Sequence, residues 1–200
     1  MTATAPEVVA VGRVVRLRVK QLEDASRDFE WRRDPELAAY DAAQPLGMSL
    51  RAFVSTLADE IKSPTQYRRT FAIEDREVGL HIGNVMYYGY DPHLREAELG
   101  ITIGNRDYWS RGYGTDAVHT MVGYLFGTLG LRRVYLHTLT WNSRAQRAFE
   151  NAGFRRVREV YRSGHDFVHM EVLREEFLAQ DASADHEGGS HTEPGSASLA

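Results

Sequence analysis

The sequence predicts a single α/β (α+β) domain whose elements follow the order βααβββαβαββ. Between residues 12 and 177, hydrophobic periods typical of strands and of helices alternate, and no internal repeat or long linker interrupts them. The chain has 200 residues, of which 42% are hydrophobic and 26% charged, as in an ordinary globular domain. We therefore expect an N-terminal extension over residues 1–11, one domain over residues 12–177, and a disordered acidic tail over residues 178–200.

The first half of the domain begins with a strand and two helices. Basic residues alternate with apolar ones over residues 15–20, which predicts a strand with one face in water. A polar helix is expected over residues 24–33. Ser49 is expected to cap a second helix, which ends before Pro64. Apolar side chains follow this cap at helical spacing: Leu50, Phe53, Val54, Leu57 and Ile61.

The second half contains the remaining strands and two further helices. Residues 68–75, 77–90 and 95–104 are strand-like and separated by turn-forming residues, which predicts an antiparallel meander. A long apolar-faced helix is expected over residues 115–129, with Gly130 as its left-handed stop. Then follow a strand over 132–140, a helix over 142–153, and a hairpin that turns at Ser163-Gly164.

Charge and composition exclude several classes of function. The formal net charge is −4 and no long basic stripe occurs, so we expect no nucleic acid as the main partner. The chain has no cysteine, which excludes thiolate nucleophiles, disulfides and zinc sites built on Cys, and its histidines lack metal-ligand spacing, so no metal is expected. It shows neither a leader-like start nor a membrane-length apolar run, so we expect a cytoplasmic protein without membrane contact.

The segment from residue 96 to residue 129 has the order strand, loop, helix that suits an anion site. Gly112 and Gly114 allow positive φ, so that successive N–H groups can converge at the positive end of the helix dipole. A pyrophosphate would fit there, and Arg111 would add a charged contact. Taken alone, these residues are weak evidence for an anion site, and a plain tight turn explains them better. The motifs of Walker loops and of dinucleotide-binding folds are absent.

Three motifs together resemble the GCN5-related N-acetyltransferase superfamily, most closely the branch that includes the ribosomal-protein N-terminal acetyltransferases. Residues 109–114 (Trp-Ser-Arg-Gly-Tyr-Gly) are similar to the acyl-CoA loop Q/R-x-x-G-x-G/A, with Trp109 in place of Gln or Arg. Asn142, Phe149 and Gly153-Phe154 are similar to the helix and strand that follow in that family. Residues 31–36 (Trp-Arg-Arg-Asp-Pro-Glu) resemble the W-x-x-D-P-E entry segment of the branch.

The resemblance implies a mixed, mostly antiparallel central sheet, flanked by helices, in which two parallel strands splay apart at residues 96–104 and 133–139. Acetyl-CoA would lie in that cleft. Backbone groups of residues 101–103 would hold the pantetheine and polarise the thioester carbonyl, and N–H groups of residues 110–115 would take the pyrophosphate. Arg147 would reach the adenosine phosphate, or is simply a solvated helix residue. The full implied set for the cofactor is Ile101, Thr102, Ile103, Trp109, Ser110, Arg111, Gly112, Tyr113, Gly114, Thr115, Asn142 and Arg147.

The implied reaction is direct attack of a primary amine on the thioester of acetyl-CoA. Glu98 is the candidate base, the alternative being a strand-edge carboxylate paired with an arginine such as Arg95 or Arg133. Many relatives use a tyrosine as the acid, but Phe149 occupies that position here. A serine can replace it in this branch, yet the matching position is an alanine, which leaves only the neighbouring Ser143. The general acid is therefore unassigned.

The acceptor site is expected to involve the first two helices and the final hairpin. Candidate contacts are Trp31, Arg32, Tyr40 and His81, although a core role for Trp31 and a structural role for His81 are the alternatives. Peptide N-termini, amino sugars, polyamines and antibiotic amines all stay open as acceptors. The family also implies a homodimer. Because residues 149 and 145 lack an acid, the alternative function is a non-catalytic acyl-CoA-binding or regulatory domain.

Overall fold

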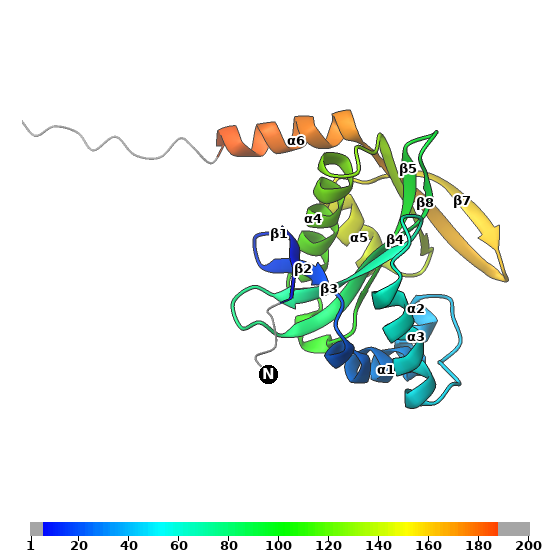
Figure 1. Ribbon diagram of the computed structural model, residues 1–200. Helices are drawn as coiled ribbons and strands as arrows, with labels where there is room; N and C mark the ends of the chain where they lie inside the picture. Colours follow the sequence, from blue (N-terminus) through cyan, green and yellow to red (C-terminus); the bar gives the residue numbers. More distant parts are fainter. Residues whose placement is uncertain (1–5, 188–200) are drawn as a thin grey trace, which may run out of the picture.

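The protein folds around one eight-stranded sheet, seen in a computed structural model that describes residues 6–187 (Figure 1). The strand order is β1-β2-β3-β4-β5-β6-β8-β7, and every neighbouring pair is antiparallel except β5 and β6. The strands are β1 (Val8–Val11), β2 (Val15–Val19), β3 (Arg69–Asp75), β4 (His81–Asp91), β5 (Glu96–Ile103), β6 (Arg133–Leu139), β7 (Arg155–Arg162) and β8 (His165–Leu173). The predicted mixed, mostly antiparallel sheet with one parallel pair is confirmed.

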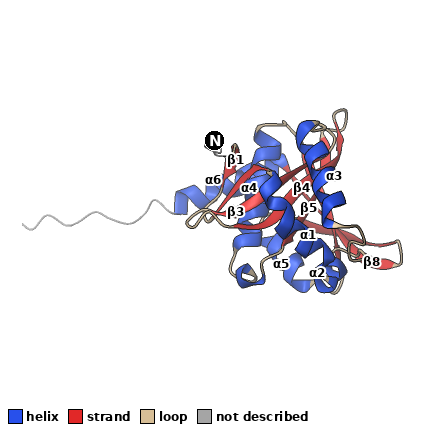
Figure 2. Cartoon of the chain, turned by 60° about the horizontal axis from the view of Figure 1, so that its bottom comes forward, coloured by secondary structure: helices blue, strands red, loops and turns tan. Residues whose placement is uncertain are grey.

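Helices flank the sheet (Figure 2). They are α1 (Ala25–Arg33), α2 (Pro35–Tyr40), α3 (Leu50–Lys62), α4 (Tyr113–Gly127), α5 (Ser143–Asn151) and α6 (Arg174–Glu187), with short 3-10 turns at Leu22–Asp24 and Arg106–Tyr108. The apolar face of α4, including Met121 and Leu125, packs into the core against strand residues such as Leu17 and Phe71. Helices α1, α2 and α3 gather at the end of the molecule away from α6 (Figure 1). None of the helices in the described part of the chain is long and apolar enough to cross a membrane.

The parallel pair is joined only at its beginning. Residues 96–98 of β5 pair with residues 133–135 of β6, and no paired residue follows along either strand toward Ile103 and Leu139. The two strands therefore diverge beyond Glu98, and their backbones are no longer paired. This divergence opens the sheet immediately before α4 and α5, as the family resemblance implies.

Local sequence fixes the helix starts that border this opening. Gly112 is the N-cap of α4 with φ +85°, and Asn142 is the N-cap of α5, where its side chain accepts from the Ala145 N–H at 3.2 Å. The Asp116 carboxylate in the first turn of α4 accepts N–H bonds from residues 13–15 and so anchors β2 to this helix. Ser49 caps α3 as predicted, by accepting from the Ala52 N–H at 3.3 Å.

Three elements differ from the predicted order. Strand β1 lies in the expected N-terminal extension, and α2 is an additional short helix that begins at Pro35 after an Asp34 cap. The expected disordered tail is wrong in its first part, because α6 continues to Glu187. Phe177 explains this, since it is buried against the rings of Phe126 and His119. Residues 188–200 of the predicted tail lie outside the described residues.

Candidate active site

A cavity of about 570 Å³ lies where β5 and β6 diverge. Its walls come from the outer part of β5, the loop before α4, the end of β6 and the first turns of α5. The structure brings together all but two of the residues predicted to hold the cofactor: Ile101, Thr102, Ile103, Trp109, Ser110, Gly112, Gly114, Thr115, Asn142 and Arg147. The cleft therefore joins segments that are far apart in the sequence.

The loop before α4 has the backbone geometry of an anion site. Ser110 (φ +57°) and Gly112 (φ +85°) are both left-handed, and they turn the chain sharply into the helix. The first N–H groups of any α-helix have no acceptor within the helix, and they carry the positive end of its dipole. In α4 these groups belong to residues 113–115, two of which line the cavity. They can bind a phosphate group.

Arg111 and Tyr113, the two remaining loop residues, are not among the residues that line the cleft. Arg111 donates through Nη1 to the Asp107 carbonyl at 3.0 Å, and its guanidinium stacks near the rings of Tyr108 and Tyr113. The Tyr113 hydroxyl donates to Asp75 Oδ2 at 3.0 Å. Both side chains therefore hold the loop from outside, which the glycine motif does not indicate.

Trp109, which replaces the usual Gln or Arg, organises the mouth of the cleft. Its indole Nε1–H donates to the Ile103 carbonyl at 2.7 Å. The Arg144 guanidinium lies 3.6 Å from the centre of a Trp109 ring and 4.8 Å from that of Tyr40. Cation–π contact of this kind joins α2, the loop and α5 around the cavity. Sequence reasoning did not single out Arg144, because one arginine among many on a helix carries no local signal.

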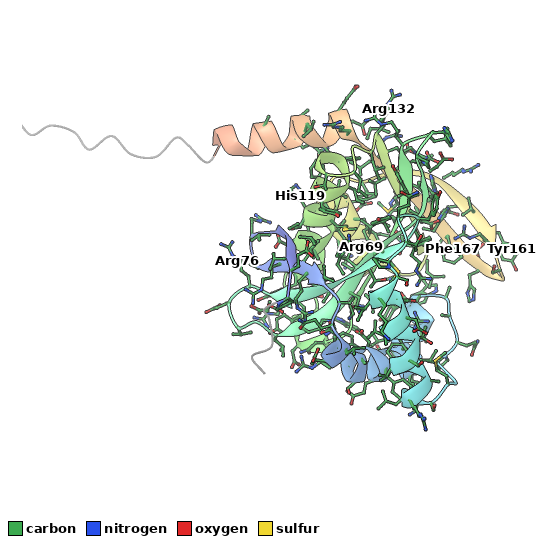
Figure 3. All side chains as sticks on the ribbon, viewed as in Figure 1. Arg69, Arg76, His119, Arg132, Tyr161 and Phe167 are labelled. Atoms are coloured by element: carbon green, nitrogen blue, oxygen red, sulfur yellow. The ribbon has the colours of Figure 1, made fainter. Side chains whose placement is uncertain are left out.

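A second cavity of about 210 Å³ adjoins the first and contains Glu98. Asp41, Tyr88, His137 and Phe167 line both cavities. The buried Glu98 accepts a hydrogen bond from His137 Nδ1 at 2.8 Å, and Arg162 Nη2 lies 3.8 Å from it. Figure 3 labels Phe167 on the hairpin beside this region.

Glu98 is not paired with either arginine that sequence reasoning offered as its alternative partner. Arg95 donates to the Gly130 carbonyl, and Arg133 binds Glu96 and Glu171. The Glu98 carboxylate instead faces the second cavity and its histidine. Its ion-pair partners are His137 and, at 3.8 Å, Arg162, which both line the second cavity.

Tyr88 and Asp41 are site residues that sequence reasoning missed. Tyr88 pairs with Glu98 across β4 and β5, and burial, the Glu98 charge and a hydrogen bond to Glu98 raise the pKa of its hydroxyl. Asp41 accepts from the Thr102 hydroxyl at 3.2 Å. The protein packed around its carboxyl removes hydration and raises its pKa, although the residue keeps solvent contact. No motif marks either residue, because the fold alone brings them to the cavities.

Two of the four predicted acceptor residues, Arg32 and Tyr40, line the main cleft, whereas Trp31 and His81 line neither cavity. Trp31 covers Gly104 so closely that a Cβ at residue 104 would lie 2.0 Å from its ring. His81 is buried with its ring 4.9 Å from that of Trp31, in a cluster with Asp24 and Asp28. Burial and the Lys20 charge lower the pKa of His81. Both side chains therefore belong to the packing beneath the site.

Ser143 is exposed and does not line either cavity, whereas Ala145 and Phe149 line the main cleft. The first residue of α5 points away from the opening because only one face of this helix borders it. The structure thus gives no support to Ser143 as the acid.

Comparisons with known proteins agree with this geometry. A family model described as "Acetyltransferase (GNAT) domain" matches residues 15–155. The uncharacterized N-acetyltransferase p20 of Bacillus licheniformis is 29% identical over 119 residues, which are 59% of this chain and 66% of that protein. The uncharacterized N-acetyltransferase YoaA of Bacillus subtilis (strain 168) is 28% identical over 86 residues, which are 43% and 48% of the two chains. The chain thus spans less than two thirds of either relative.

Solved structures share the fold. A spermidine N-acetyltransferase from Vibrio cholerae in complex with CoA and spermine matches with a TM-score of 0.73 and 22% identity, over 82% of this chain and 98% of that chain. An acetyltransferase of the GNAT family from Bacillus anthracis matches with a TM-score of 0.69 and 16% identity, over 83% and 98%. At these identities the likeness concerns the fold.

Proposed function

This chain belongs to the acetyltransferase (GNAT) domain family, and from that premise we propose that it transfers the acetyl group of acetyl-CoA to a primary amine. The superfamily predicted from the sequence motifs is thereby confirmed, whereas its ribosomal-protein branch stays a prediction. The observation that carries the proposed function is the pair of adjoining cavities, one at the anion-binding start of α4 and one at a buried carboxylate. A donor and an acceptor can meet where the cavities share their lining residues.

The donor fits the larger cavity. The N–H groups at the start of α4 suit its pyrophosphate, and the parted backbone of residues 101–103 suits the amide-bearing pantetheine arm. Asn142 borders the arm from the opposite wall, and Arg147 lies on the same helix for a phosphate. When bound, acetyl-CoA supplies the activated acyl group. These residues orient it toward the second cavity.

Glu98 and Tyr88 supply the proton transfers in this proposal. A neutral amine forms the new N–C bond while the C–S bond of the thioester breaks. Glu98 takes the proton that the nitrogen loses, and Tyr88 protonates the departing thiolate. The hydrogen bond between these two side chains lets the proton on Glu98 return to Tyr88, so that both groups are restored after one turnover. The raised pKa of Tyr88 keeps its proton in place at neutral pH.

The acceptor is an amine that enters the cavity beside Asp41 and Glu98. Two carboxyl groups favour a cationic amine, while Arg162 and His165 on the same cavity favour an acceptor that also carries an oxygen acceptor group. A peptide N-terminus, which the entry motif at residues 31–36 suggests through its resemblance to the ribosomal-protein branch, has both features. Spermidine, the substrate named for the Vibrio cholerae neighbour, has only the first.

A non-catalytic acyl-CoA-binding or regulatory domain is the second candidate. Phe149 favours it, because an aromatic ring without a hydroxyl lines the cleft at the position of the family's acid. The two functions differ in turnover and not in cofactor binding.

A thiol-release assay with acetyl-CoA separates them. The acceptors are spermidine and a short peptide with a free N-terminus, with the N-acetylated peptide as a blank. We expect release with the free peptide, and a loss of about 100-fold or more in kcat/KM for Glu98→Gln. Thiol release from no amine, by a protein that binds acetyl-CoA, would establish the binding domain instead.

A further inference from the structure

Four side chains form an unbroken hydrogen-bonded row behind the acceptor cavity. Glu98 Oε1 lies 2.8 Å from His137 Nδ1, His137 Nε2 lies 3.0 Å from His169 Nδ1, and His169 Nε2 lies 3.1 Å from Arg133 Nη2. The residues come from three adjacent strands, β5, β6 and β8, and His137 pairs directly with His169 in the sheet. The row begins at the cavity and ends at an arginine held by Glu96 and Glu171.

The row has only one consistent direction of donation while both histidines are neutral. An arginine nitrogen can only donate, so His169 Nε2 must accept and its proton must be on Nδ1. That Nδ1–H then donates to His137 Nε2, which places the proton of His137 on Nδ1. The His137 Nδ1–H in turn donates to Glu98. The two ends agree, because the carboxylate at the other end can only accept.

The neutral state of His169 is supported by its surroundings. Burial lowers the pKa of His169, the charge of Arg133 lowers it further, and a proton on His137 would act in the same direction. The charge of Glu171 raises the pKa of His169, and that of Arg158 lowers it. A second proton on His169 Nε2 would point at the Arg133 guanidinium, which is an unfavourable contact between cations.

We propose that Arg133 and His169 are positioning residues that lock His137 as an Nδ1–H donor to Glu98. One oxygen of Glu98 is then tied down, and the carboxylate is held toward the amine with its other oxygen able to take a proton. The link to catalysis rests on the proposed function, whereas the proton positions on the two rings do not. In an isolated neutral imidazole, either ring nitrogen can carry the proton.

Other charged and titratable groups face the same carboxylate. Tyr88 on β4 donates to Glu98, Arg162 on β7 lies 3.8 Å away, and Asp41 and His165 share its cavity. They orient the carboxylate, and within the described part of the chain none of them is hydrogen-bonded to either histidine. The Tyr135 ring lies 6.0 Å from that of His137 and 5.5 Å from that of His169, so it packs against the row without breaking it.

The proton positions are measured by long-range proton–nitrogen NMR correlation on the full-length protein labelled with ¹⁵N-histidine, at pH 8. Single His137→Asn and His169→Asn variants assign the signals. We expect both rings as the Nδ1–H tautomer. In Arg133→Met, where nothing forces His169 Nε2 to accept, we expect His169 to lose this fixed tautomer. Glu96→Gln and Glu171→Gln weaken the ion pairs of Arg133 but keep its contact with His169, and should leave both tautomers unchanged.

Kinetics then test the positioning role. The side-chain N–H of Asn lies where the Nδ1–H of His lies, so His137→Asn should retain most of kcat, whereas His137→Leu should lose about 10-fold or more with the KM for acetyl-CoA unchanged. Equal activity of His137→Leu and wild type would overturn the role in catalysis. An Nε2–H tautomer at either ring of the wild type would overturn the lock itself. If no amine is turned over, the NMR result still decides the lock while the proposed function fails.

Discussion

Tyr88 carries the proposed acid role on a strand position where sequence patterns suggest only sheet packing. The expected result of Tyr88→Phe is a loss of about 10- to 100-fold in kcat, because water must then protonate the thiolate, with little change in the KM for acetyl-CoA. Its raised pKa also predicts that the wild type keeps its activity up to at least pH 10 as far as this hydroxyl is concerned. Steady-state kinetics between pH 6 and pH 10 measure both effects.

Ser143→Ala is the matched control, since it removes a hydroxyl that is exposed and outside both cavities. It should stay within a factor of two of the wild type. A large effect of Ser143→Ala together with a neutral Tyr88→Phe would reverse the assignment of the acid.

Site residues could be predicted from the sequence where they belong to a motif or to the parallel pair of strands. Those that reach the cavities only through tertiary packing were missed. Glu98 could be predicted because it stands on the strand that borders the cleft. Asp41 and Arg144 could not, because each reaches the cavity from a helix end whose direction no local pattern sets. His81 was predicted as an acceptor contact but lies in neither cavity. An alternating pattern shows that a strand has two faces, but it does not show which elements cover each face.

The β7–β8 hairpin delivers side chains to the acceptor cavity. Its turn has φ +52° at Ser163 and +84° at Gly164, as the sequence predicted for a two-residue loop. Phe167 points to the cavities, whereas Tyr161 on the same hairpin is 74% exposed (Figure 3). We expect Phe167→Ala to raise the KM for the amine by about 10-fold through lost apolar contact, and Tyr161→Ala to leave it unchanged. Initial rates over a range of amine concentrations test the pair. A similar effect of both variants would mean that the hairpin acts through its stability alone.

Elements were predictable where their pattern is local, and were missed where tertiary contacts make them. The strong apolar face and cap of α3 identify it from sequence, and the observed bounds of β6 lie within the predicted strand. Helix α6 has a sequence rich in Ala and acids, and its first turns are held by Phe177, a single apolar anchor in the core. Strand β1 shows no alternation of apolar and polar residues, so its own sequence does not identify it as a strand. Its pairing with β2 orders it.

The molecule as a whole should lose stability as the pH falls from neutral. The pKa values of the buried His81 and His169 are lowered from 6.5, so the unfolded chain binds protons before the native chain does. The free energy of unfolding that depends on their neutral forms is fully present above about pH 6.5. It is lost as the pH falls toward their native pKa values, by up to about 1.4 kcal/mol per pH unit for each histidine.

Asp41 acts in the opposite direction, because its raised pKa makes the native state the stronger proton binder above pH 3.8. Two histidines outweigh this single carboxyl between pH 6.5 and pH 5. Urea unfolding across this range should show a falling free energy of unfolding. A flat or rising profile would contradict the neutral state assigned to both buried rings.

Calorimetry with two matched variants tests whether the cleft at the start of α4 binds acetyl-CoA. Gly112 (φ +85°) and Gly164 (φ +84°) have nearly the same φ, and at both positions an added Cβ meets nothing within 4 Å. Gly112→Asp and Gly164→Asp therefore add the same strain and the same charge, but only residue 112 faces the phosphate site. We predict micromolar binding by the wild type and by Gly164→Asp, and a loss of at least about 10-fold in affinity in Gly112→Asp. Equal binding by the two variants would mean that the start of α4 does not hold the phosphates, and no binding by the folded wild type would mean that acetyl-CoA is not the ligand of the cleft.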